Sequence, residues 1–155
     1  MLMDVENVLD ERIDPYELER FRDDYERGIK TGAPTVAATF CYAHGLIKST
    51  KQDVNEGIRL LEDLLRKEPD EMPKRDYVYY LAIANARLKD YDRALAYLDV
   101  LLAVETHNRQ ARELKEIIEK KMKRALEGLL GAAVIGGGAV LVGGLLAAVF
   151  AAARR

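Results

Sequence analysis

Residues 75–108 read RDYVYYLAIANARLKDYDRALAYLDVLLAVETHN, and this stretch decides the fold. Apolar residues recur every three or four positions on both sides of the Lys89-Asp90 turn, which predicts two helices joined by a tight connection. Small residues, Ala82 and Ala94, stand where two antiparallel helices would cross closely. Larger apolar residues on either side would fill the space between them. The stretch therefore predicts a compact helical hairpin.

The spacing of this hairpin is that of the 34-residue tetratricopeptide repeat (TPR). Val78, Asn85 and Thr106 replace the Trp, Tyr and Pro of the usual pattern. A weaker copy lies at about 37–71, with Phe40 in the Trp position and Gly57 at the crossing point. The positions of the better copy that match are Leu81, Ala82, Ala84, the Asp90-Tyr91 turn, Ala94, Leu98 and Leu101.

Two repeats are few, because stacked repeats need neighbours that cover their outer faces. Strand signals are scarce in the rest of the chain, and apolar spacing of three and four continues, which predicts an all-α, six-helix TPR-like bundle over residues 14–124. Asp14-Pro15 starts the first helix, and Asp53 to Glu56 form a capping box for the third. We expect helices from Pro15 to about 28–32, from Thr35 to about 48–52, over 54–67, 74–88 and 91–105, and from Asn108 with no stop before Gly128.

Residues 1–13 form an N-terminal arm that has the pattern of neither a signal peptide nor a transit peptide. Its apolar residues have two possible places. They could lie in a groove of the bundle and compete with a partner, or they could pack on its outside or stay disordered. The residues concerned are Leu2, Val5, Val8 and Leu9.

At the other end, residues 128–153 run for 26 positions without a charged or polar side chain. About 20 apolar residues span a bilayer, so we interpret residues 125–153 as a transmembrane tail anchor, followed by a basic tail at 154–155. Basic side chains that could reach the headgroups flank it: Lys120, Lys121, Lys123, Arg124, Arg154 and Arg155. Small residues form a ridge that could pair with a second copy: Ala139, Gly143, Ala147 and Ala151.

Over nearly its whole length the chain resembles the mitochondrial fission 1 protein family. Three segments carry the resemblance in order, ahead of the Gly-rich anchor: GIRLLEDLL at 57–65, RDYVYYLA at 75–82 and RLKDYDRAL at 87–95. The resemblance implies a bundle on the cytosolic face of the mitochondrial outer membrane, and often of peroxisomes. Family members act as adaptors that recruit dynamin-related GTPases, directly or through other adaptor proteins.

Composition argues against catalysis and against nucleic-acid binding. One serine, one cysteine and two distant histidines, His44 and His107, provide neither a nucleophile with its base nor metal-ligand spacing, and no phosphate loop is present. Residues 1–127 hold 22 basic and 26 acidic residues, a mild acidity that gives no reason to expect nucleic acid. We expect no enzyme, cofactor or metal. Cys41, the single cysteine, is interpreted as a small packing residue.

Binding is better supported, because the first helix of each TPR lines a concave groove. A groove of this kind suits an amphipathic helix or an extended apolar segment. We expect Tyr79 and Ile83 to be exposed in it, and Tyr77, Tyr80, Tyr91 and Tyr97 to be repeat core. The inward positions are Asp76, Tyr79, Ile83, Ala86 and Arg87 in the better repeat, and Ala38, Cys41, Gly45 and Lys48 in the weaker one.

Three functions fit these patterns. The first is a membrane-anchored adaptor for organelle fission. The second is a tail-anchored TPR receptor for other clients, such as precursor proteins. The third is a structural scaffold that forms homo-oligomers through its anchor.

Overall fold

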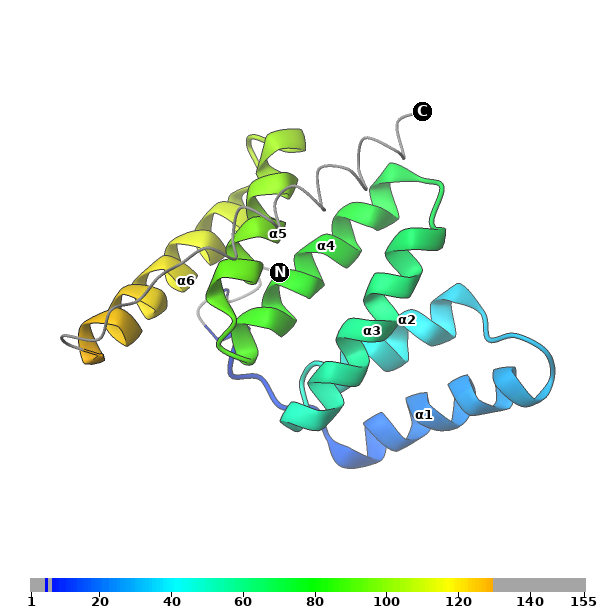
Figure 1. The fold of residues 1–155 in the computed structure, drawn as a ribbon. Helices are drawn as coiled ribbons and strands as arrows, with labels where there is room; N and C mark the ends of the chain where they lie inside the picture. Colours follow the sequence, from blue (N-terminus) through cyan, green and yellow to red (C-terminus); the bar gives the residue numbers. More distant parts are fainter. Residues whose placement is uncertain (1–4, 6, 130–155) are drawn as a thin grey trace.

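The computed structural model describes residue 5 and residues 7–129, and this part of the chain contains six α-helices and no strand (Figure 1). It confirms the all-α, six-helix prediction. The helices are α1 (Pro15–Lys30), α2 (Val36–Leu46), α3 (Lys51–Lys67), α4 (Glu71–Arg87), α5 (Tyr91–Val104) and α6 (Arg109–Gly128).

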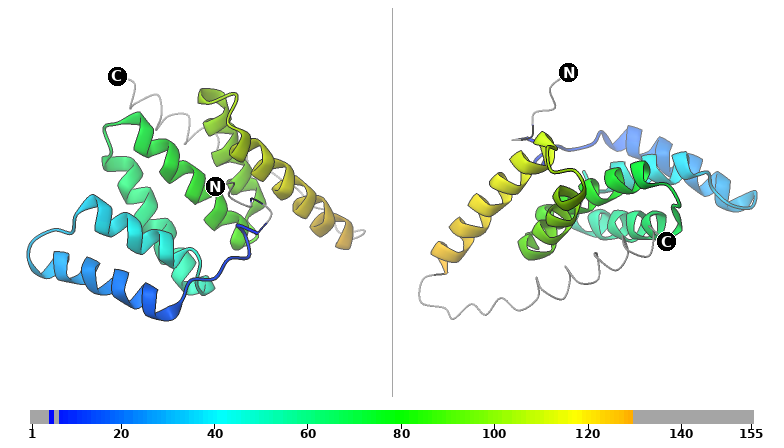
Figure 2. Two further views of the ribbon diagram at one scale, coloured as in Figure 1. Left: turned by 180° about the vertical axis from the view of Figure 1, so that it is seen from behind. Right: turned by 90° about the horizontal axis from the view of Figure 1, so that it is seen from above.

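The helices stack in chain order. The pairs α2–α3 and α4–α5 are the two repeats, and α3 packs against α4 to join them. α1 lies against α2 at one end of the stack and α6 against α5 at the other (Figures 1 and 2). The outer helices therefore act as the caps that a two-repeat stack requires.

Small residues at the helix crossings allow the close approach within each repeat. Ala82 and Ala94 are fully buried in the second repeat. In the first, a Cβ on Gly57 would lie 2.8 Å from Ile47 Cγ2 and 3.1 Å from the Ala43 carbonyl oxygen. Such contacts are too short for a side chain, so α2 and α3 approach this closely only because residue 57 is glycine.

Two predicted helix starts are wrong by three residues. The third helix begins at Lys51, not 54, because Thr50 is its N-cap: the Thr50 hydroxyl accepts a hydrogen bond from Asp53 N at 3.2 Å. The fourth begins at Glu71, not 74, because Pro73 lies in the first turn, where a missing N–H has no helical acceptor to lose. The start of α1 is as predicted, with Asp14 Oδ1 accepting from Tyr16 N at 2.8 Å.

Helix α6 continues beyond the bundle. Ile118 is its last buried residue, and none of residues 119–129 is buried. The predicted membrane flank Lys120, Lys121, Lys123 and Arg124 lies on this projecting part. The helix reaches Gly128, in agreement with the prediction of no stop before that residue.

In the part of the chain that the structure describes, no helix has the length and apolar character that crossing a membrane requires. The small-residue ridge Ala139, Gly143, Ala147 and Ala151, and the basic pair Arg154 and Arg155, lie outside the described residues.

Candidate functional site

The N-terminal arm, described at residues 5 and 7–13, lies across the C-terminal end of α4. Arg87 Nη1 donates a hydrogen bond to the Leu9 carbonyl oxygen at 2.8 Å. Figure 2 (left) shows the arm running from the start of α1 past this end of α4 towards α6. Val5, Val8 and Leu9 are all buried, whereas Leu2 lies outside the described residues. The arm is thus part of the packed structure.

A second set of contacts holds the arm beside the α2–α3 turn. Ile13 N donates to the Lys48 carbonyl oxygen at 3.1 Å, and the Lys48 Nζ lies 3.1 Å from Glu11 Oε2. Lys48, an inward position of the weaker repeat, therefore contacts the arm through both its backbone and its side chain.

The inward positions of α4 divide into covered and open ones. The prediction that Tyr79 and Ile83 are exposed is wrong: their exposed fractions are 8% and 2%. Ala86 is buried as well, Arg87 is half-buried, and Asp76 is exposed. The prediction rests on the two stacked repeats alone. In the folded chain, the arm and α6 also lie against the inward face of α4.

The inward positions of α2 do not form one surface either. Ala38 is half-buried and Cys41 is exposed, so the interpretation of Cys41 as a packing residue is wrong. Gly45 is buried, and a Cβ there would lie 2.9 Å from Ile13 Cδ1 and 3.1 Å from Leu18 Cδ1. Gly45 faces the arm and α1, and it offers no surface to a partner.

An aromatic cluster joins the two repeats. The His44 ring of α2 meets the Tyr80 ring of α4 edge-on, with 4.8 Å between centroids, and Phe40 lies 5.6 Å from Tyr80 and 5.7 Å from Tyr77. Burial, with the charge of Lys48, lowers the pKa of His44 to about 4. His44 is therefore a neutral packing residue at pH 7.

The open end of α4 borders a cavity of about 230 Å³ between α4, α5 and α6. Asp76 and Tyr79 both line it, with Glu105 at the end of α5 and Gln110 at the start of α6. Burial, and then the charge of Glu105, raise the pKa of Asp76. Burial raises the pKa of Tyr79 to about 12, so its hydroxyl stays neutral. The cavity is thus open, polar and bordered by carboxylates.

Comparison with known proteins gives the family. Residues 37–68 match the model of the Fis1 N-terminal tetratricopeptide repeat, and residues 75–129 match that of the Fis1 C-terminal tetratricopeptide repeat. The FIS1-related protein fis-2 of Caenorhabditis elegans is 49% identical over 99% of this chain and 100% of its own length. The mitochondrial fission 1 protein of Mus musculus is 42% identical over 91% of each chain. The chain belongs to the mitochondrial fission 1 protein family.

Solved structures of this family have the same fold. A chain of yeast Fis1, in complex with an Mdv1 fragment containing N-terminal extension and coiled coil domains, gives a TM-score of 0.71. It is 30% identical in sequence and covers 81% of this chain and 98% of its own. Fis1 of Saccharomyces cerevisiae gives a TM-score of 0.69 at 30% identity, over 82% and 96% of the two chains.

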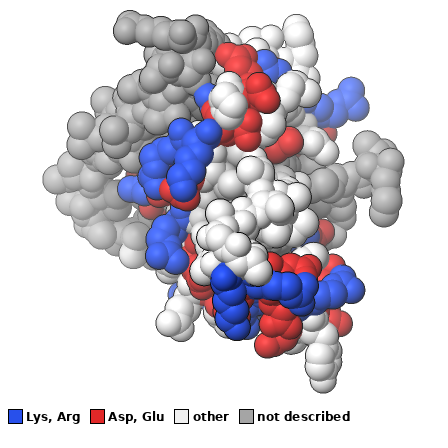
Figure 3. Space-filling view, turned by 90° about the vertical axis from the view of Figure 1, so that its right-hand side faces the viewer, with Lys and Arg blue, Asp and Glu red and all other residues white. Residues whose placement is uncertain are grey.

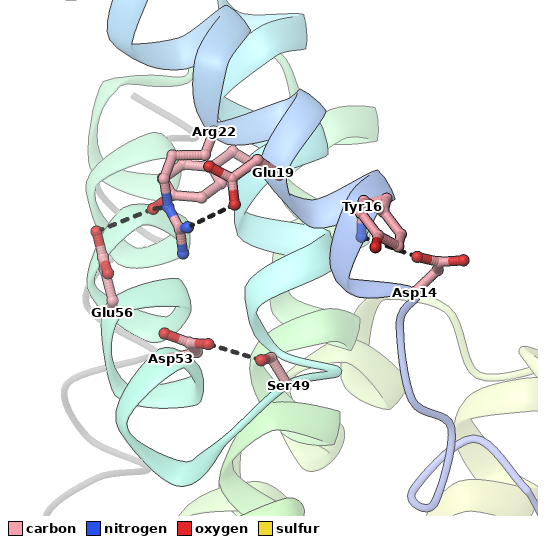
Figure 4. A network of polar contacts seen from close by, with 8 residues as sticks. Asp14, Tyr16, Glu19, Arg22, Ser49, Asp53 and Glu56 are labelled. Carbon is pink, nitrogen blue, oxygen red and sulfur yellow. Dashed lines mark hydrogen bonds and ion pairs between the residues drawn. The ribbon is translucent and has the colours of Figure 1, made fainter.

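A polar network that the sequence did not reveal fixes the first helix of this family member to its neighbours (Figure 4). Arg22 Nε donates to the Tyr42 hydroxyl at 3.2 Å, and that hydroxyl donates to Glu56 Oε1 at 3.5 Å. Arg22 also pairs with Glu19 at 3.7 Å. The network links α1, α2 and α3, with the Tyr42 side chain at its centre.

An uncharged surface lies on the side of the α1–α2 connection. Residues 31–47 contain no Lys, Arg, Asp or Glu, and within them Val36 is 56% exposed. Figure 3 shows this side as an uncharged area between charged ones. The family member therefore carries an apolar area on α2 beside the more polar open end of α4.

Sequence reasoning identified no metal centre, and among the described residues no group of three or more His, Cys, Asp or Glu side chains could hold a metal ion. It also missed the contacts of the arm, for which the sequence carries little signal. The atom that binds Arg87 is a backbone carbonyl, and any residue at position 9 would provide it.

Proposed function

We propose that this protein is an adaptor for mitochondrial fission. Residues 125–153 anchor it in the mitochondrial outer membrane with the bundle in the cytosol, and peroxisomes are a second location. It recruits dynamin-related GTPase machinery, either directly or through another adaptor. It is a binding protein and not an enzyme.

The observation that carries the proposal is the likeness to yeast Fis1 bound to an Mdv1 fragment. That fragment contains an extension and a coiled coil, so a partner segment of similar kind is the natural ligand to propose here. TPR faces accept helical or extended segments, and two features of this chain suit the binding of such a segment. Half-buried aromatic side chains, Phe40 and Tyr80, are available between the repeats, and a polar cavity lies beside them.

The proposed binding surface is the face that the arm crosses. Its open part includes Asp76 and the cavity beside it, and its covered part is the end of α4 that Leu9 contacts. A partner long enough to follow the whole of α4 would displace the arm. We therefore propose that the arm competes with the partner for the covered part.

The binding surface is tested with Asp76→Arg, since Asp76 is exposed and borders the cavity. The matched control is Asp23→Arg, an exposed carboxylate on α1. Full-length variants with an N-terminal tag replace the endogenous protein in cells, and proximity labelling measures partner recruitment. We expect Asp76→Arg to reduce the labelling of fission proteins about tenfold, because charge reversal at an interface adds repulsion to lost contacts. Asp23→Arg should change it less than twofold. Equal labelling by both variants would exclude this end of α4 as part of the partner-binding surface.

The same cells separate an adaptor from the alternatives. Overexpression of a fission adaptor should fragment the mitochondrial network. A receptor for precursor proteins would instead label import clients, and a scaffold that oligomerises through the ridge from Ala139 to Ala151 would leave the network unchanged. Gly143→Ile, which blocks close helix approach, tests the scaffold by crosslinking in bilayers.

Competition by the arm is tested by deleting residues 1–10. This removes the contact between Leu9 and Arg87, so amide exchange around Ile83 and Ala86 should become faster, and partner labelling should increase. Circular dichroism verifies that the truncated chain keeps its helices. Unchanged amide protection in α4 would dismiss the competition.

A further inference from the structure

A second cavity, of about 260 Å³, lies where the arm, the α2–α3 turn and the end of α4 meet. The arm, the start of α3 directly after the turn, and the end of α4 each contribute a cation to the lining of this cavity. Arg12 comes from the arm, Lys51 is the first residue of α3, and Arg87 is the last residue of α4. Asp10 is the one carboxylate among the described residues that line it.

The positive charge in this cavity is not balanced. Within the described residues, no ion pair joins Arg12, Lys51 or Arg87 to a carboxylate, in contrast to Lys48 nearby, which pairs with Glu11. The hydrogen bond of Arg87 is to a neutral carbonyl, that of Leu9. Burial, and then the charge of Arg12, lower the pKa of Arg87, and the weaker effects of Asp10 and Glu11 oppose them. Among the lining residues, three cations and one carboxylate leave an excess of two positive charges.

An anion with two negative charges and several oxygens matches this lining. A phosphate monoester carries about −1.5 to −2 at pH 7 and presents three acceptor oxygens. It can meet cations from three directions at once, whereas a carboxylate carries one charge on two oxygens. Arginine guanidinium groups bind phosphate through two parallel N–H donors, and two of the three cations are arginines. α3 begins at Lys51, and the amide dipoles at that end also favour an anion.

We propose that the cavity lined by Arg12, Lys51 and Arg87 binds a phosphate group, and that the bound group fastens the N-terminal arm to α3 and α4. The phosphate group belongs either to a small soluble molecule or to a lipid headgroup, since both present the same chemistry. The inference goes beyond the adaptor function and does not depend on it. A ligand that contacts the arm and the bundle together stabilises the closed arm by mass action.

The test is hydrogen exchange on the purified full chain in detergent micelles. Inorganic phosphate is titrated against sodium chloride at matched ionic strength, and exchange of the amides of residues 7–13 is followed by mass spectrometry. We expect phosphate, and not chloride, to slow this exchange in a saturable way. The double variant Arg12→Gln with Lys51→Gln should weaken the apparent affinity about tenfold, because charge-assisted hydrogen bonds are lost.

The matched control is Arg59→Gln, an exposed arginine on α3 outside the cavity. It should bind phosphate within twofold of the unchanged chain. A parallel measurement in vesicles of phosphatidylcholine, with and without phosphatidic acid, distinguishes the sources. Slowing by phosphatidic acid and not by free phosphate identifies a lipid headgroup, and slowing by free phosphate identifies a soluble ligand.

The proposal is overturned if neither phosphate source slows exchange in the arm. It is also overturned if slowing is not saturable, or if the double variant and Arg59→Gln respond alike. Circular dichroism shows whether the double variant is folded. If it is not, Lys51→Gln alone gives the same comparison, because this side chain is exposed at the start of α3 and its replacement leaves the core unchanged.

Discussion

The two capping helices are held in different ways. α6 places Ala111, Leu114 and Ile118 fully inside the core, with no exposed surface. α1 buries only Leu18, and its other contacts are half-buried or polar, among them the bond from Arg22 to Tyr42. The C-terminal cap is therefore part of the hydrophobic core, whereas the N-terminal cap is docked at its edge.

The two caps also differ in their relation to the N-terminal arm. The arm enters the bundle immediately before α1, and its contacts with Lys48 and Arg87 lie on the side of that weaker cap. Apolar burial is not screened by salt and involves no titrating group, whereas polar contacts between charged groups at the surface are sensitive to both salt and pH. Changes in salt or pH should therefore affect the docking of α1 and the arm more than the docking of α6.

The largest expected effect comes from truncating the buried leucine of each cap. Leu114→Ala should lower the free energy of unfolding by about 3 kcal/mol, since it leaves a cavity in a fully buried site. Leu18→Ala should cost about 2 kcal/mol, because the edge can partly close around the smaller side chain. Urea denaturation followed by circular dichroism measures both. A larger loss from Leu18→Ala than from Leu114→Ala would reverse the comparison.

An intermediate effect is expected from pH, through His44 in α2. Its pKa of about 4 in the folded chain lies below the usual value, so the unfolded chain binds a proton first as pH falls. Stability from this residue is complete above about pH 6.5 and is lost between there and pH 4. At pH 5 we expect a loss of about 1 to 2 kcal/mol relative to pH 7.

Two variants isolate this contribution. His44→Gln cannot gain the proton, so the difference in unfolding free energy between it and the unchanged chain should shrink at pH 5. His107→Gln, at an exposed position between α5 and α6, is the matched control. If both variants show the same pH dependence as the unchanged chain, His44 is not the residue responsible.

The smallest expected effect compares polar contacts of the two caps. Tyr42→Phe removes the hydroxyl that accepts from Arg22 and donates to Glu56, and it should cost about 1 kcal/mol. Lys115→Gln breaks an ion pair between α6 and Asp99 of α5, 2.9 Å long but largely exposed, and should cost at most about 0.5 kcal/mol. Thermal denaturation of both variants is the measurement. An equal cost would mean that polar contacts matter as much to α6 as to α1.

The parts of the fold that were predictable from sequence are those with local causes. The hairpins follow from apolar spacing and from small residues such as Gly57 and Ala94 at the crossings. Helix starts were less certain, because Thr50 and Asp53 are both good caps and only one of them is used. The expected start at residue 74 leaves Pro73 outside the helix, although a first helical turn accepts proline.

The candidate site was less predictable, because burial on α4 depends on segments far away in sequence. Position along a repeat indicates which side Tyr79 and Ile83 face, but not that α6 and the arm cover that side. The contact between Arg87 and Leu9 joins residues 78 positions apart through a backbone atom. The charged residues among the inward positions were better guides to the surface. Asp76 is exposed beside the cavity between α4, α5 and α6, and Arg87 lines the second cavity, beside the arm.

The unburied end of α6 has a mechanical consequence. Residues 119–128 continue as helix past the last core contact, which adds about 15 Å of length. The proposed anchor begins at residue 125, so residues 119–124 are the part of this extension outside it, which is about 9 Å of helix. A helix is at least about 10 Å wide, so neither a single helix nor a folded domain would fit between the bundle and the lipid. With the proposed anchor in a bilayer, division proteins would approach the bundle from the sides or from above.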